Sequence, residues 1–154
     1  MLVYRIVQKK YSQTLVAPGI EGRWNRRGQQ VIYTAESIPL AFMGNMIRRA
    51  GLGFNDNFGI MIIEIPEKVF IEQLKVEDLK KGWRDSTLIC QEAMADWYTS
   101  HKSAVMKVPS AVLSTNSNYV LNTTHADYSK IKLISSLDLV PDERIDEIIR
   151  RYNR

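Results

Sequence analysis

The chain has 154 residues, 45% of them hydrophobic, which is enough for one domain with a sizeable core and too little for two ordinary ones. We therefore expect a single domain over residues 1–154. Its formal charge of +4 suits an anionic ligand or an acidic partner surface, although small proteins often carry as much without a binding role. One cysteine excludes an internal disulfide and a thiolate metal cluster, and two histidines leave little for a zinc site, so no metal is expected.

The sequence shows no secretion signal at its N-terminus, and its apolar runs, such as residues 60–63, are far shorter than a membrane span. We therefore expect a cytoplasmic protein that does not contact membranes.

Residues 2–7 alternate in the manner of an opening strand, with Arg5 on the face opposite Tyr4 and Ile6. An arginine in a strand is usually a solvated edge residue, and this is the expectation for Arg5. Residues 9–20 are polar and end in Pro-Gly, which predicts a loop or a short helical turn.

A polar loop comes next, between Gly22 and Gly28, both of which allow tight backbone turns. It is rich in side-chain donors suited to an anion such as phosphate, namely Arg23, Asn25, Arg26 and Arg27. Residues 31–34 then predict a strand.

A helix is predicted after this strand, with Ser37 as its N-cap and a proline tolerated in its first turn. The spacing predicts an inward face made of Leu40, Met43, Gly44 and Ile47. Gly44 is out of place there, because a glycine inside a helix costs about 1 kcal/mol relative to alanine and adds no packing.

Residues 51–56 predict a loop, residues 58–65 a strand buried on both faces and stopped by Pro66, and residues 69–74 its neighbour. A second helix is expected after the N-cap Ser86, with a buried stripe of Cys90, Ala93, Met94 and Trp97. We interpret Cys90 as a packing residue, since a reactive thiol needs an electropositive and partly exposed setting.

Residues 104–114 predict a strand that Pro109 interrupts, which favours an edge position or a bulge. Ser110 follows the break and is either a pocket residue or a hydroxyl that satisfies the interrupted ladder. Residues 116–125 are dense in turn formers, and His125 is expected at the surface or as a cap.

The chain closes with a strand over residues 131–139 and a helix over residues 141–152. The helix carries an apolar stripe, which either docks on the sheet or makes a subunit contact: Ile145, Ile148, Ile149 and Tyr152. Several strands and a few helices without regular alternation indicate an α+β fold.

Four segments in order carry a resemblance: GRWNRRGQQVIYTAES at residues 22–37, LAFM at 40–43, VPSAV at 108–112 and LNTTH at 121–125. Together they resemble the RES-domain family, toxins of bacterial toxin–antitoxin pairs. The resemblance implies an ADP-ribosyltransferase-like mixed sheet with flanking helices. It also implies an enzyme that depletes NAD+ by cleaving the nicotinamide–ribose bond, with water or phosphate as acceptor.

The resemblance assigns roles residue by residue. The arginine and serine of the family name fall on Arg5 and Ser110, and Arg23 and Tyr33 match further residues of the NAD+ pocket. Arginines can grip a pyrophosphate and a tyrosine ring can lie against nicotinamide or ribose. The glutamate of the name, which would stabilise the oxocarbenium-like transition state, falls on Gly44. We interpret the chain as a toxin of this kind in an inactivated form.

Glu36 could substitute for the missing acid, but it precedes the helix and lies on the other face of the strand from Tyr33 if the strand continues. The resemblance also implies an Xre-type helix-turn-helix antitoxin, whose tail would block the pocket entrance with the basic loop as docking surface. We also expect self-association, either through the apolar stripe of the last helix or, if that stripe packs on the core, through another surface.

Three other functions stay open. The chain could be a catalytically inactive module that only binds an antitoxin or a nucleotide. Alternatively, it could transfer ADP-ribose to a macromolecule. A nucleic-acid-binding surface could be built from five arginines: Arg23, Arg26, Arg27, Arg48 and Arg49. The sequence holds no nucleic-acid-binding motif and only a modest charge excess, so we expect no direct binding to nucleic acid.

Overall fold

The computed structural model describes residues 1–49 and 57–152, and the loop predicted over residues 51–56 lies outside them. Its centre is a mixed seven-stranded sheet in the order β4-β5-β6-β2-β1-β3-β7. Only β4 and β5 run parallel, and every other neighbouring pair is antiparallel. The strands are β1 Leu2–Gln8, β2 Val31–Ala35, β3 Phe58–Glu64, β4 Ile71–Gln73, β5 Val105–Pro109, β6 Ser117–Asn122 and β7 Lys132–Asp138.

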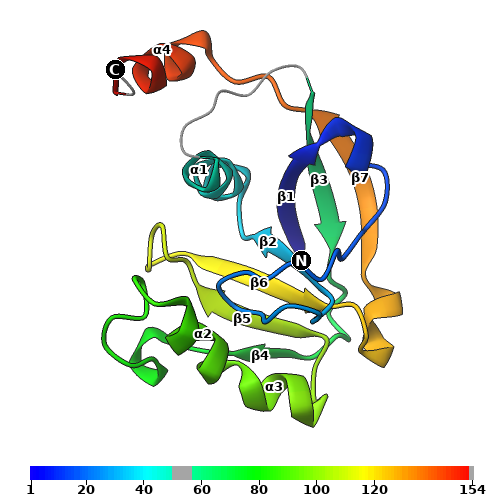
Figure 1. Cartoon of the computed structure of the whole chain (residues 1–154). Helices are drawn as coiled ribbons and strands as arrows, with labels where there is room; N and C mark the ends of the chain where they lie inside the picture. Colours follow the sequence, from blue (N-terminus) through cyan, green and yellow to red (C-terminus); the bar gives the residue numbers. More distant parts are fainter. Residues whose placement is uncertain (50–56, 153–154) are drawn as a thin grey trace.

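Helices flank the sheet, so the predicted α+β class is confirmed (Figure 1). They are α1 Ile38–Arg48, α2 Thr87–Ala93, α3 Ala95–Ser100 and α4 Glu143–Tyr152, with short 3-10 turns η1 Lys9–Tyr11, η2 Val76–Asp78 and η3 Ala126–Lys130. Helix α1 lies beside β1, α2 and α3 lie beside β4 and β5, and α4 stands away from the sheet. No helix among the described residues is long and apolar enough to cross a membrane.

The sheet is divided into two groups of strands, which run in different directions in Figure 1. Strands β1, β3 and β7 form one group, and β2, β6, β5 and β4 form the other. Among the described strands, the two groups pair with each other only where β1 meets β2, and that pairing consists of one residue pair, Tyr4 with Ala35. By contrast, β1 pairs with β3 over its whole length. The two groups therefore separate beyond Tyr4 and Ala35.

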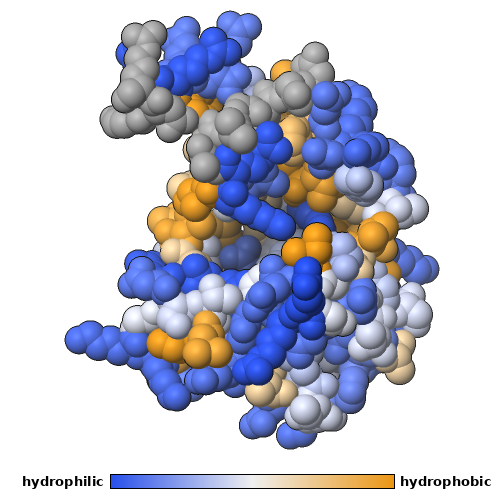
Figure 2. Space-filling model, in the orientation of Figure 1, coloured by the Kyte–Doolittle hydropathy of each residue, from blue (hydrophilic) through white to orange (hydrophobic). Residues whose placement is uncertain are grey.

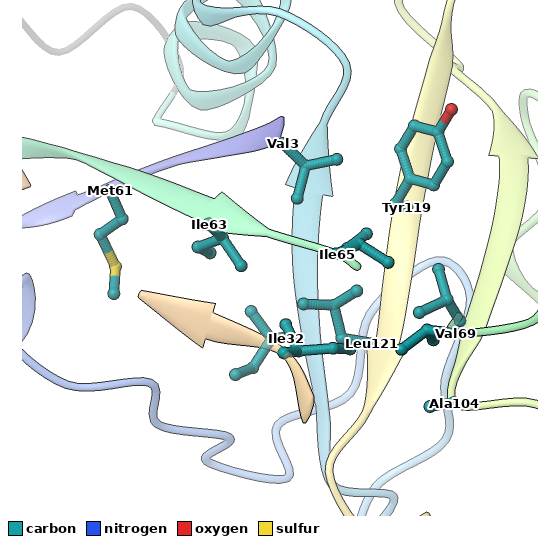
Figure 3. Close-up of a cluster of buried hydrophobic side chains, with 11 residues drawn as sticks. Val3, Ile32, Met61, Ile63, Ile65, Val69, Ala104, Tyr119 and Leu121 are labelled. Atoms are coloured by element: carbon teal, nitrogen blue, oxygen red, sulfur yellow. The ribbon is translucent and has the colours of Figure 1, made fainter. Parts of the chain in front are cut away.

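The core that holds the two groups together lies on one face of the sheet (Figure 3). Val3 of β1 and Ile63 of β3 belong to the first group, and Ile32 of β2 and Leu121 of β6 belong to the second. All four side chains are completely buried. This apolar cluster compensates for the weak pairing between β1 and β2, because burying a large aliphatic side chain contributes about 1.5–3 kcal/mol.

Several predicted elements are confirmed within a residue or two, including the strand that begins at Phe58 and the helix that begins after Ser37. Ser37 caps α1 by accepting a hydrogen bond from the backbone N–H of Leu40, at 3.3 Å. Ser86 caps α2 in the same way, with the N–H of Ile89 at 3.4 Å.

Other predictions were wrong. The segment 116–125, read as turns, contains β6, an interior strand whose central residues Tyr119, Val120 and Leu121 are buried. Residues 71–73 pair with β5 and not with β3. The predicted second helix is two short helices, α2 and α3, with Met94 between them.

The strand that contains Pro109 is not an edge strand, because β5 lies between β4 and β6. The proline is tolerated because it ends the strand. Strand β4 pairs only with residues 105–107, so β5 has no ladder partner on that side at Pro109. A missing N–H costs little at such a position.

Candidate functional site

Two of the predicted site residues come near each other along the backbone where the sheet divides, although Arg5 lines a pocket with Ile32 whereas Tyr33 packs against Trp24 and Val31. Arg5 follows Tyr4 on β1, and Tyr33 precedes Ala35 by two positions on β2. Both residues therefore lie within two positions of the single pair that joins the groups. Strand β1 is an interior strand and Arg5 is only partly exposed, so the expectation of a solvated edge arginine was wrong.

A pocket of about 330 Å³ spans this division. Its walls come from β1, β2 and β3, through Arg5, Ile32 and Met61, and from the loop over residues 14–20. Of the described residues that line the pocket, Arg5 is the charged one and most of the others are apolar. The surface is also hollowed between the α1 region and the strands β2 and β6 (Figure 2).

The hydroxyl of Tyr33 is held in a clamp. It accepts a hydrogen bond from the backbone N–H of Trp24 at 2.8 Å and donates to Asn25 Oδ1 at 2.7 Å. Burial raises the pKa of Tyr33 well above its ordinary value, while nearby cationic Arg48 and Arg23 act in the opposite direction. The hydroxyl is therefore neutral and occupied, and the ring is the part of Tyr33 that a ligand can use.

Asn25 is part of the same clamp and is completely buried. Its side-chain amide donates to the carbonyls of Ile20 at 2.9 Å and Arg26 at 3.1 Å. The prediction that Asn25 offers a donor to an anion was therefore wrong. Arg26 and Arg27 are the exposed cations of the loop.

Arg23 is directed toward the segment that leads into α2. Its Nη1 donates to the carbonyl of Trp83 at 2.9 Å and makes a weak contact with Cys90 Sγ at 3.8 Å. Cys90 is completely buried, and burial raises its pKa although the hydrogen bond from Arg23 opposes this. Its predicted role as a packing residue is confirmed, since a buried neutral thiol is a poor nucleophile.

Gln91 is a buried residue that sequence reasoning missed. Its Nε2 lies 3.0 Å from Glu21 Oε1 and from the carbonyls of Gly22 and Asn25. A glutamine in a short helix has no distinctive sequence signal. Its contacts fix the base of the basic loop to α2.

An added methyl group should have opposite effects on stability at Gly22 and at Gly44. A Cβ at Gly22 would lie 2.7 Å from Tyr33 Oη and 2.9 Å from Asn25 Oδ1, whereas one at Gly44 meets nothing within 4 Å. We expect Gly22→Ala to lower the free energy of unfolding by about 1–3 kcal/mol through overpacking. Gly44→Ala should raise it by about 0.5–1 kcal/mol through helix propensity. Urea unfolding of both variants checks this, and equal effects would contradict the packing at Gly22.

The face of α1 that packs on the sheet differs from the predicted one. Ile38, Ala41, Phe42 and Met46 pack against the cluster that contains Ile6. Within the predicted inward face Leu40 is buried, but Met43 is 38% exposed and Ile47 63% exposed. The inward placement of Gly44 was therefore wrong, because Gly44 borders open space and not the packed core.

Asn45 fixes the position of α1 relative to β1. Its Nδ2 donates to the carbonyl of Ile6 at 2.9 Å, which ties the middle of the helix to the residue after Arg5. Its Oδ1 is buried without a hydrogen-bond partner among the described residues. The tie brings the helix turn that contains Gly44 alongside the strand that contains Arg5.

Arg48, which the sequence analysis considered only for nucleic acid, is a further candidate for the site. It is exposed and lies one helical turn after Gly44. Burial and then the charge of Arg48 lower the pKa of Arg5, and the same charge favours the ionised form of Tyr33. Arg48 is therefore within electrostatic range of both residues at the division of the sheet.

Ser110 lies beyond the end of β5 and is almost completely buried. Its Oγ accepts hydrogen bonds from the backbone N–H groups of Val112 at 3.2 Å and Leu113 at 3.4 Å. These bonds close the turn that follows the strand. None of the hydrogen bonds of Ser110 connects it to Arg5 or Tyr33.

Glu36 lies directly after β2 and accepts a hydrogen bond from Asn116 Nδ2. Its backbone N–H donates to the carbonyl of Ser117 at 3.2 Å. The carboxylate therefore joins the end of β2 to the turn that precedes β6. Among the described residues, no group of three or more histidine, cysteine, aspartate or glutamate side chains could hold a metal ion.

Comparison with known proteins gives consistent matches. A family model described as "RES domain" matches residues 2–144. The chain is 29% identical over 152 residues to "Toxin Res" of Yersinia enterocolitica, covering 94% of this chain and 99% of that protein. It is 28% identical over 115 residues to "Prs ADP-ribosylating toxin" of Sphingobium sp., covering 72% of this chain and 71% of that one.

Among solved structures, the crystal structure of the M. tuberculosis MbcT-MbcA toxin-antitoxin complex matches with a TM-score of 0.71. The match covers 97% of this chain and 88% of that chain at 21% identity. At this level of identity the match establishes the similarity of the fold.

Proposed function

Because the chain belongs to the RES-domain family, we propose that it is the toxin of a toxin–antitoxin pair and that its site is built for NAD+. The observation that carries the proposal is the division of the sheet, where Arg5 and Tyr33 both lie within two positions of the one pair that joins the two groups of strands. A partly buried arginine and an aromatic ring suit the phosphates and the flat ring of a dinucleotide.

The proposed reaction breaks the bond between the nicotinamide nitrogen and C1′ of its ribose. The bonding electrons leave with nicotinamide, and water or phosphate adds to the oxocarbenium-like carbon. In this chain Arg5 and Arg23 would hold the phosphates, and the ring of Tyr33 would lie against nicotinamide or ribose. Ser110 would act through the turn that it closes, at the nicotinamide–ribose end.

The catalytic acid belongs at position 44, where this chain has glycine. A carboxylate there would stabilise positive charge that exists only in the transition state. The open space beside Gly44 supports this proposal, because a longer side chain fits without displacing the core. We propose that the chain with Gly44 binds NAD+ and is catalytically impaired.

Binding of NAD+ should depend on Arg5 at the division of the sheet and on Arg23 of the basic loop. We expect Arg5→Ala and Arg23→Ala to weaken binding roughly ten- to a hundred-fold, since hydrogen bonds to charged groups contribute about 1.5–3 kcal/mol. Arg26→Ala is the matched control, because Arg26 is an exposed cation of the same loop. Calorimetric titration with parallel thermal melts measures this, and unchanged affinity in folded Arg5→Ala and Arg23→Ala would refute the assignment of the phosphates.

Transfer of ADP-ribose to a macromolecule is the second candidate function. The name of the Sphingobium relative, "Prs ADP-ribosylating toxin", favours it. The same site would serve, with a protein nucleophile in place of water or phosphate. Label transfer from NAD+ to protein, compared with release of free ADP-ribose, separates the two reactions.

An antitoxin is the proposed partner, since the matched solved structure is a toxin–antitoxin complex. We propose an Xre-type helix-turn-helix protein whose tail covers the cleft, and the exposed side chains of Met43, Ile47 and Arg26 offer it a surface. We expect the chain to co-purify with the product of a neighbouring gene and Ile47→Asp to weaken the complex. If the chain stays monomeric and does not bind this gene product, the proposed pairing is refuted.

A further inference from the structure

The proposed site concentrates positive charge without a compensating acid. Arg5 and Arg48 influence each other electrostatically, and Arg48 and Arg23 both act on Tyr33. Within residues 1–49 and 57–152, no carboxylate lies within ion-pair distance of any of these three arginines. Like charges within electrostatic range of one another repel, and an anion bound between them relieves this repulsion.

The two acidic residues on either side of the basic loop and β2 are held by amide groups. Glu21 is bound by Gln91 Nε2 at 3.0 Å, and Glu36 is bound by Asn116 Nδ2. An amide satisfies a carboxylate without changing its charge, and neither acid pairs with an arginine of the site. The arginines therefore have no acidic partner from these elements.

Helix α1 places Arg48 on the same side as Gly44. The two residues are four positions apart and so neighbour each other on the helix surface. The hydrogen bond from Asn45 to Ile6 fixes this part of α1 on the face of β1 that carries Ile6. The position assigned to the acid is thus bordered by the cation Arg48, and Gly44 contributes no side chain beside it.

Whether the dinucleotide is oxidised, reduced or cleaved then decides how well it fits this site. The nicotinamide ring of NAD+ carries one positive charge, which the ring of NADH lacks and which ADP-ribose has lost with the ring. A site with arginines and no carboxylate repels that charge while it attracts the phosphates. This step rests on the proposed function, because that proposal brings the ring end of the ligand to position 44.

We propose that this chain, with Gly44 in place, is a binding site for ADP-ribose and for reduced dinucleotide, and that it discriminates against NAD+. Arg48 is the residue that sets this preference, since it borders position 44 and is held by no ion pair among the described residues. In the cell such a chain would retain the cleaved form of the cofactor rather than the intact oxidised form.

The test is calorimetric titration of the full chain with ADP-ribose, NADH and NAD+. We expect ADP-ribose and NADH to bind about ten-fold more tightly than NAD+, which corresponds to one unit charge at moderate distance and screening. Arg48→Gln should reduce the ratio to roughly two- to three-fold, whereas Arg48→Lys should retain it. Lys102→Gln removes an exposed cation between α3 and β5 and should leave the ratio unchanged.

Each result has a distinct meaning. NAD+ binding as tightly as ADP-ribose would overturn this inference and leave the proposed function standing. NADH binding as weakly as NAD+, with ADP-ribose tight, would also overturn it, because ring size and not charge would then set the preference. If none of the three ligands binds the folded chain, the proposed function fails together with the inference.

Discussion

Replacing Gly44 with glutamate is expected to turn this chain into an enzyme that consumes NAD+ and arrests growth. The loss of one electrostatic stabiliser typically costs about 2.7–4 kcal/mol, so the variant should be on the order of a hundred- to a thousand-fold more active than the parent. A Cβ at position 44 meets nothing within 4 Å, so the longer side chain can be accommodated. Arg48, one turn later, favours the ionised form of the new carboxylate.

The experiment expresses both forms under tight control and follows growth together with intracellular NAD+. Gly44→Gln is the matched control, since it adds the same volume and no charge, and it should leave both readouts at the parental level. Gly44→Ala controls for the gain in helix propensity. A folded Gly44→Glu variant that spares NAD+, or a parent chain that drains it at a comparable rate, would contradict the assignment of position 44.

Asn25→Ala is expected to have the largest effect on stability. The variant leaves the carbonyls of Ile20 and Arg26 without their donor and the hydroxyl of Tyr33 without its acceptor. Unsatisfied buried polar groups cost about 1–3 kcal/mol each, so the free energy of unfolding should fall by about 3 kcal/mol.

Urea unfolding measures this effect, with Arg27→Ala as the control because Arg27 is an exposed residue of the same loop. Arg27→Ala should change stability by less than about 0.5 kcal/mol. Asn25→Asp keeps the acceptor for Tyr33 and loses the two donors, so it should also be strongly destabilising. If Asn25→Ala unfolds like the parent, the clamp around Tyr33 is not a determinant of the fold.

Local sequence signals predicted those elements whose patterns are self-contained. Examples are the caps Ser37 and Ser86 and the uniformly apolar strand that begins at Phe58. Capping and a continuous apolar run depend on neighbouring residues only. Strand β6 was missed because its ends are asparagines and a serine, which locally favour turns. Tertiary pairing with β2 and β5 on its two sides overrides that preference.

The site could be predicted only in part. The resemblance gave Arg5 and Tyr33, and the register of β1 and β2 places both within two positions of the pair that joins the two groups of strands. The sequence could not show that the side-chain amide of Asn25 makes its hydrogen bonds inside the protein, because the tertiary fold decides whether an asparagine is buried or exposed. The packing face of α1 was also misassigned. Its periodicity fits two faces, and contact with Ile6 selects the one that contains Phe42 and Met46.

A crystal structure of the Gly44→Gln variant with NAD+ tests the central claim most directly. We expect the phosphates beside Arg5 and Arg23, the nicotinamide or ribose against the ring of Tyr33, and C1′ within about 3–3.5 Å of the side chain at position 44. NAD+ bound instead in the polar groove of about 310 Å³ that contains Lys75 and Lys107 would contradict it. The absence of NAD+ from the division of the sheet at a saturating concentration would contradict it as well.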